Sequence, residues 1–143
     1  MLVLLIVNIG AMTLKFFYNV KSKEKLYKAA LVHDIGIKAS EEKYGDSDGS
    51  HQEEMGPELA RELLKSLNYN EKVIDRVCYL VAHHHTYFDV DGMDYQILIE
   101  ADFLVNMYEN HMDAPACRSV YERIFRTTTG KRICRRMYPV REE

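Results

Sequence analysis

The chain has 143 residues, of which 47% are hydrophobic and 29% are charged, and its net charge is −3. These values are ordinary for a single globular domain with its own core, and they argue against disorder. A slightly acidic chain lacks the basic excess that binds a nucleic-acid polymer or an anionic membrane, so we expect neither partner. Three cysteines without a CxxC spacing predict reduced thiols in a cytoplasmic protein.

The chain begins with an apolar stretch from Met1 to Met12. No positive segment precedes it, as one would in a signal peptide, and Lys15 interrupts it before the roughly 18 apolar residues that a membrane-spanning helix needs. We therefore expect a first helix over residues 2–18 that is buried in the core. The alternative is a short membrane anchor.

The remaining chain has the pattern of helices joined by short polar connections. Apolar spacing predicts a helix over 22–35, and Gly36 is expected just past its end with a positive φ. A polar loop over 39–50 follows. The Ser50-x-x-Glu53 capping-box pattern then predicts a helix to about residue 68, with Pro57 as the alternative first residue.

The second half of the chain continues the same pattern. We expect a helix that starts at the Asn70 cap and runs into three histidines, a loop over 86–92, a helix over 94–109, and a helix that Asp113 caps. Residues 127–130 are expected to separate it from a short last helix. No segment alternates like a strand, so we predict an all-α bundle of about six to seven helices in a single domain over residues 1–143.

The most informative pair of side chains is His33-Asp34, which ends an apolar helical run. A neutral imidazole and an ionised carboxylate are good ligands for a divalent transition metal. Asp102 interrupts an otherwise apolar helix, where a lone carboxylate is costly unless it is paired or bound to a metal. A salt bridge or a surface position is the alternative for Asp102.

Four further histidines lie between these points. Three consecutive residues of a helix point about 100° apart, so His83, His84 and His85 cannot all face one site. His51 stands near a helix entrance and is either exposed or in contact with a ligand. The basic C-terminal quarter is best explained as a solvated helix face.

The order of these residues resembles the HD superfamily of metal-dependent phosphohydrolases, especially its small bacterial members. Val32-His33-Asp34-Ile35-Gly36, then His83-His84, then Glu100-Ala101-Asp102 carry the resemblance, which covers about residues 20–110 and leaves 113–143 as a helical extension. The resemblance implies a helical bundle in which His33, Asp34 and Asp102 bind a divalent metal. By position, it implies that His51, His83 and His84 could hold a second metal or a phosphate.

Two features depart from the family pattern. The family's first metal ligand is a His on the helix before the His-Asp pair, whereas this sequence has no His before His33, and Asn8 would be a poor substitute. Many members carry Lys directly after the Gly, whereas Ile37 stands here and Lys38 follows it.

The leading expectation is a phosphohydrolase that acts on a nucleotide or another small phosphate ester. Its cofactor would be a divalent ion of Mn, Fe, Mg, Ni, Co or Zn, and the expected catalytic residues are Asp34, Glu53, Glu54 and Lys38, with Glu53 or Glu54 as general base. The alternative is a degenerate HD module that binds a nucleotide or a partner protein without catalysis. A membrane-tethered helical protein is a third possibility, and the oligomeric state is left open.

Overall fold

The computed structural model describes residues 23–140, and this part of the chain is helical without any strand, which confirms the predicted all-α class. The expected helix over 2–18 and Asn8 lie outside the described residues. The elements are α2 (Lys23–Val32), the 3₁₀ helix η2 (His33–Gly36), α3 (Ile37–Tyr44), α4 (Gly49–Ser66), α5 (Glu71–Val81), α6 (Met93–Glu109), α7 (Ala114–Ile124) and α8 (Thr128–Met137). None of the helices in this part combines the length and the apolar character that crossing a membrane requires.

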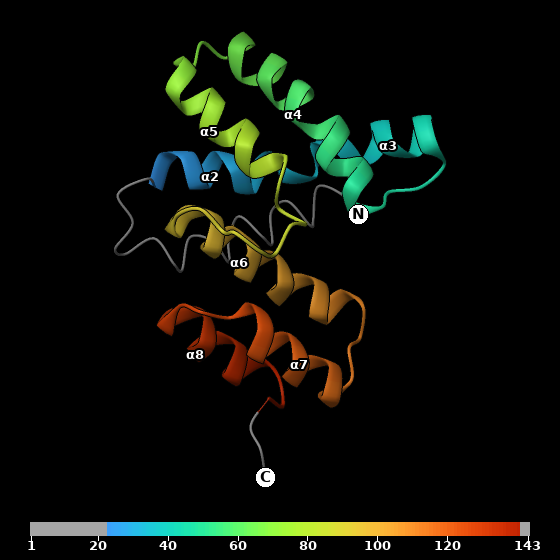
Figure 1. Cartoon of the computed structure of the whole chain (residues 1–143), viewed down its shortest axis with the longest axis vertical. Helices are drawn as coiled ribbons and strands as arrows, with labels where there is room; N and C mark the ends of the chain where they lie inside the picture. The colour runs from blue at the N-terminus through green and yellow to red at the C-terminus, as the bar shows by residue number, and fades with distance from the viewer. Residues whose placement is uncertain (1–22, 141–143) are drawn as a thin grey trace.

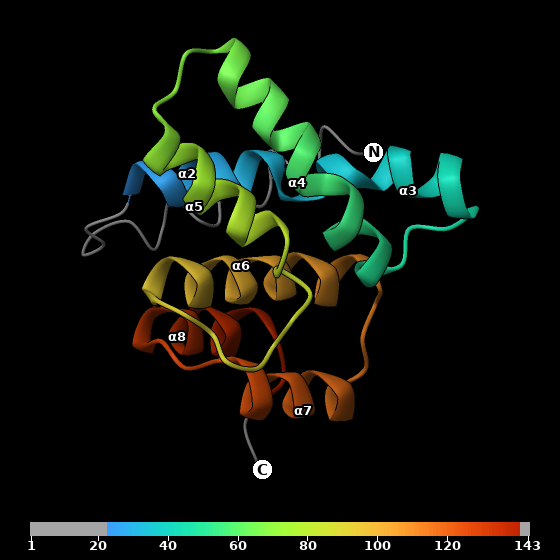
Figure 2. The ribbon, with the colours of Figure 1, turned by 45° about the horizontal axis from the view of Figure 1, so that its top comes forward.

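Helix α6 forms the middle of the described structure. Figures 1 and 2 show α2, α4 and α5 on one side of it and α7 and α8 on the other. Its buried residues lie all around the helix, as expected for one covered on several sides. They include Tyr95, Leu98, Ile99, Leu104 and Met107. Because Asp102 lies on this helix, its carboxylate is carried into the interior.

A second buried carboxylate of α6 ties the C-terminal helices to the core. Glu100 is fully buried and accepts hydrogen bonds from the backbone N–H groups of Arg126 and Thr127, at 2.6 and 2.8 Å, and from the amide of Gln96. Gly130 leaves room for it, since a Cβ there would lie 1.9 Å from Glu100 Oε2. A buried carboxylate is tolerated where donors surround it in this way.

Two helix starts agree with the sequence prediction because local chemistry determines them. The Asn70 side chain accepts a hydrogen bond from the N–H of Val73, and the Asp113 side chain accepts one from the N–H of Ala116. Each thereby satisfies a backbone donor that the first helical turn leaves free. The predicted helix over 94–109 is confirmed as α6.

The predicted polar loop over 39–50 is wrong, because α3 occupies its first half and α4 begins at Gly49. The positive φ predicted for Gly36 is also wrong, since its φ is −77°. A left-handed residue is found instead at Gly45, which ends α3 with a φ of 81°. The Ser50–Glu53 capping box is also wrong: Asp48 caps α4 by accepting from the N–H of Ser50. The helix starts at Gly49 and contains Pro57, so neither expected start is correct.

The predicted separator over 127–130 is likewise part of a helix. Thr127 is the N-cap of α8, and its hydroxyl accepts from the N–H of Gly130. The Thr-rich sequence therefore starts the last helix and does not merely precede it.

Gly36 is needed for the close approach of two helices. A Cβ at this position would lie 2.7 Å from the carbonyl oxygen of Gln52 and 2.9 Å from the backbone nitrogen of Gly56. In turn, a Cβ on Gly56 would lie 2.7 Å from a methyl of Val81 on α5. The two glycines let η2, α4 and the end of α5 pack together, and this brings the His-Asp pair near the histidines that follow α5.

Candidate metal centre

His33 and Asp34 enter the core on η2, directly after the buried face of α2. The Nδ1 atom of His33 lies 3.0 Å from the carbonyl oxygen of Ala30. A carbonyl can only accept, so this contact assigns the proton of the neutral imidazole to Nδ1 and leaves the lone pair on Nε2. That Nε2 atom lies 3.2 Å from Oδ2 of Asp34.

Asp102 reaches the same point from α6. Its Oδ1 atom lies 3.6 Å from Nε2 of His33, and its Oδ2 atom accepts a hydrogen bond of 2.9 Å from the Asn106 amide, one helical turn further along. The amide therefore holds one carboxylate oxygen and directs the other toward His33. Support of this kind is typical of ligating carboxylates. The structure thus brings His33, Asp34 and Asp102 together.

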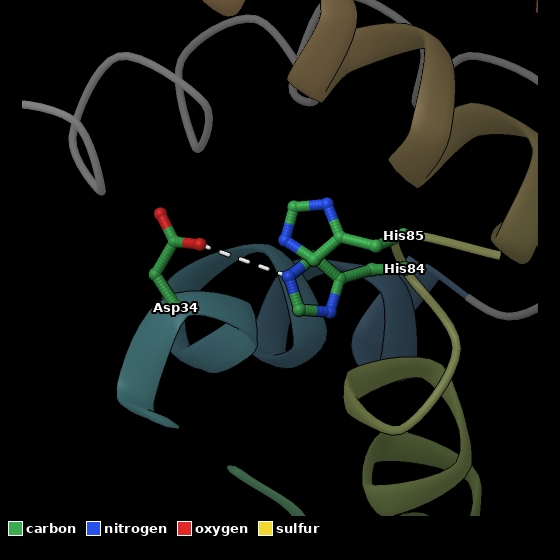
Figure 3. A group of neighbouring side chains, drawn as sticks. All are labelled: Asp34, His84 and His85. Atoms are coloured by element: carbon green, nitrogen blue, oxygen red, sulfur yellow. Dashed lines mark ion pairs between the residues drawn. The ribbon is translucent and has the colours of Figure 1, made fainter. Parts of the chain in front are cut away.

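Two histidines from the turn after α5 complete the cluster. Nε2 of His84 lies 3.7 Å from Oδ1 of Asp34, and the ring centroids of His84 and His85 lie 4.1 Å apart. One ligand atom each from Asp34, His84 and His85 lie within 4.8 Å of one another. Figure 3 shows the Asp34 carboxylate pointing toward the His84 ring, with the ring of His85 beside it.

The nitrogens of this cluster have the properties of metal ligands. His84 repeats the arrangement of His33, with Nδ1 2.8 Å from the carbonyl oxygen of Val81. Within the described structure, the buried Nε2 atoms of His33, His84 and His85 form no hydrogen bond. Buried polar atoms rarely lack a hydrogen bond, and carboxylate oxygens of Asp34 are near two of these three nitrogens, a set of groups that fits a divalent cation.

The charges of the cluster also fit a cation. Burial alone would lower the pKa of His33, but the adjacent carboxylates of Asp102 and Asp34 outweigh it and raise the pKa to about 10. Burial would raise the pKa of Asp34, but His33 and His84 hold it well below its usual range. Burial lowers the pKa of His85, and His84 lowers it further. Two buried carboxylates therefore attract positive charge. Without metal, a proton on Nε2 of His33 supplies this charge at neutral pH, and a bound cation would displace that proton, whereas His85 stays neutral.

His85 was not among the expected ligands, and two residues of α4 place it. Its backbone N–H donates to Oε1 of Glu53 at 2.9 Å, and the Thr86 hydroxyl also bonds to this carboxylate. Gly49 makes room for the ring, because a Cβ there would lie 2.7 Å from Cγ of His85. Glu53 therefore connects α4 to the turn that carries the histidines.

Two expected second-site residues lie outside this group. The Nδ1 atom of His83 is 2.7 Å from the carbonyl oxygen of Tyr79, and its ring stacks on the Tyr79 ring. His51 pairs with Asp46 at 2.6 Å and stacks on Tyr44. Of the histidine triplet, His84 and His85 therefore face Asp34.

Two expected catalytic residues lie at the surface. The side chain of Lys38 is 82% exposed, and its nearest acidic partner is Glu42 on the next helical turn, at 3.8 Å. Glu54 accepts hydrogen bonds from Lys43 and Tyr44.

Asn106 is a site residue that the sequence analysis did not identify. Its signal in the sequence is its position four residues after Asp102, the spacing that brings helical side chains together.

A helical bundle that gathers histidines and aspartates in its interior, with free imidazole nitrogens, belongs to the class of metal-binding helical domains. The family model described as HD domain matches residues 2–125, which is most of the chain, so this chain belongs to the HD domain family. No curated protein and no solved structure gives a match to the chain. Domains of this family bind divalent metals, and metal-dependent phosphohydrolases are characteristic of it.

Proposed function

We propose that this protein is a metal-dependent phosphohydrolase acting on a nucleotide or another small phosphate ester. The observation that carries the proposal is the buried group of His33, Asp34, His84, His85 and Asp102, in which three Nε2 atoms have no hydrogen bond. Family membership supports the reaction class. The three cysteines are free and buried, which suits the reducing cytoplasm that we propose as its location.

The ligands divide into two overlapping sets. His33, Asp34 and Asp102 form one, and Asp34, His84 and His85 form the other. Asp34 belongs to both, because its Oδ2 atom faces His33 and its Oδ1 atom faces His84. We propose that the first set holds a divalent cation of the Mn, Fe, Mg, Ni, Co or Zn type, and that the second set is able to hold another.

A bound divalent ion would supply a Lewis acid for a phosphoryl oxygen and would lower the pKa of an attacking water. The protein contributes the orientation of the ligands, through the carbonyl groups of Ala30 and Val81 and the amide of Asn106. Of the two candidate bases, Glu53 is better placed than Glu54, since it bonds the backbone of His85. Lys38 remains a candidate for phosphate contact from the surface.

The alternative is a non-catalytic module that binds a nucleotide or a partner protein. The observation behind it is that no His precedes His33 in this sequence. The position of His85 weakens this alternative, because His85 adds to the site a candidate metal ligand that the resemblance to the family did not include. With His85, five side chains surround the site, which suffices for a cation with positions left for water and substrate.

The test is a hydrolysis screen on protein stripped with chelator and then supplied with Mn²⁺, Fe²⁺, Mg²⁺, Ni²⁺, Co²⁺ or Zn²⁺. The substrates are nucleoside mono-, di- and triphosphates together with p-nitrophenyl phosphate. We expect phosphate release that needs added metal and that disappears in the Asp34→Asn variant. Release should persist in the control variant Asp75→Asn, because Asp75 is a surface residue paired with Arg61. Metal binding without hydrolysis of any substrate would favour the non-catalytic module.

A further inference from the structure

A cavity of about 170 Å³ lies beside the metal centre, between the segment after α5 and the helices α6 and α7. Tyr87 and Phe88 line it from the segment and Ile99 from α6, whereas Arg123 lies at the end of α7 and Arg126 just after it. None of these residues belongs to the proposed metal site. Tyr87 is the connection between the two places, since its hydroxyl lies 3.3 Å from Nδ1 of His85.

The volume of the cavity suits one aromatic ring. A cavity of about 150 Å³ holds benzene, so about 170 Å³ has room for a single ring, and Tyr87, Phe88 and Ile99 supply apolar contacts although most of the exposed wall is polar. Phe88 is 73% exposed, so its ring is accessible to a ligand at this site. Aromatic side chains such as Tyr87 and Phe88 pack favourably against another ring.

The charges at the cavity favour an anion. Arg126 donates to the backbone carbonyls of Glu122 and Arg123, and these bonds at the end of α7 fix the position of its guanidinium group. Arg123 uses its Nε to bond the carbonyl of Ser119. Within residues 23–140, neither guanidinium group forms an ion pair. Asp89 also lines the cavity, so the lining contains two basic residues and one acidic residue.

We propose that this cavity is a second binding site, separate from the metal centre, for a small aromatic phosphate monoester. The ring lies against Phe88 and Ile99, and the phosphate accepts hydrogen bonds from Arg123 and Arg126. Guanidinium groups bind phosphate well because their planar donors match its oxygens. The proposal goes beyond the hydrolase function, because it requires neither metal nor turnover.

The experiment is an NMR titration of the amide resonances with phenyl phosphate in the presence of EDTA, which keeps the metal centre out of the measurement. We expect saturable shifts at residues 87–90 and 123–126. In the double variant Arg123→Gln/Arg126→Gln, we expect the dissociation constant to rise at least about tenfold, since charged hydrogen bonds are lost. Phe88→Ala, which removes an exposed side chain, should also weaken binding.

The matched control is Arg135→Gln/Arg136→Gln, which removes the same charge from exposed positions on α8. This control should bind phenyl phosphate as the unaltered protein does. The proposal is overturned if phenyl phosphate gives no saturable shifts, if both double variants lose affinity equally, or if inorganic phosphate binds as tightly as phenyl phosphate. Because no metal is present, failure of the hydrolase proposal would leave these results unchanged.

Discussion

Nε2 of His84 lies 3.7 Å from Oδ1 of Asp34, the carboxylate oxygen that does not face His33. This contact joins the 3₁₀ helix η2 to the turn after α5, two parts of the chain that are far apart in sequence. The Asp34 carboxylate is therefore the centre of the site. Changes that move η2 relative to α5 should affect metal affinity even where they leave the ligands themselves intact.

Gly36→Ala tests this dependence on close packing. The added Cβ would meet backbone atoms of α4, so η2 must shift, and we expect a loss of about 1–3 kcal/mol in the free energy of unfolding. Metal affinity should fall as well, since His33 and Asp34 move with η2. Urea denaturation and metal titration measure the two effects.

Gly45→Ala is the control for this prediction. Gly45 has a positive φ but open space around it, so an Ala there costs about 1 kcal/mol of backbone strain without meeting another helix. Its metal affinity should equal that of the unaltered protein. If Gly36→Ala also keeps full metal affinity, the packing of η2 against α4 does not position the site.

Glu53→Gln should weaken metal binding without unfolding the protein. The carboxylate holds the backbone of His85 and the hydroxyl of Thr86, and losing its charge weakens both bonds. Groups that orient metal ligands typically change affinity on the order of 10–100-fold. Isothermal titration with Mn²⁺ measures this change.

Glu54→Gln is the matched control, one residue further along α4. Glu54 bonds Lys43 and Tyr44 at the surface and does not contact the cluster. Equal affinities for the two variants would show that Glu53 does not act through His85.

The sequence predicted those features that depend on neighbouring residues. Asn70 and Asp113 were correctly identified as caps, because a cap is a contact across three residues. Gly36 was misread, because its actual role, contact with α4 at Gly56, leaves no local pattern. Glu53 was misread for the same reason. It has the spacing of a capping box, but its side chain instead makes a distant contact with His85, which leaves no local pattern.

The histidine triplet shows where sequence reasoning on the site stopped. Helical geometry was applied to His83, His84 and His85, but α5 ends at Val81 and the three residues form a turn. Their directions are therefore set by packing: His83 against Tyr79, and His85 against Gly49. The His33, Asp34 and Asp102 positions could be proposed from sequence, whereas the part played by His85 could not.

The three cysteines should be unreactive in the native protein. All three are buried, and burial raises the pKa of Cys78, Cys117 and Cys134, the last to about 12. A raised pKa means that each thiol stays protonated at pH 8, and the thiolate is the reactive form. We expect Ellman's reagent to react slowly at pH 8 and to detect three thiols rapidly after denaturation in guanidinium chloride. Rapid reaction of the native protein would contradict the buried positions.

The most direct test of the metal centre is elemental analysis of protein purified without chelator, incubated with divalent cations and freed of excess metal by gel filtration. We predict at least one bound cation per chain in the unaltered protein and in Asp75→Asn. We predict much less in Asp34→Asn, because that carboxylate faces both His33 and His84. No bound metal in the unaltered protein, or equal metal content in Asp34→Asn, would contradict the assignment of this cluster as a metal site.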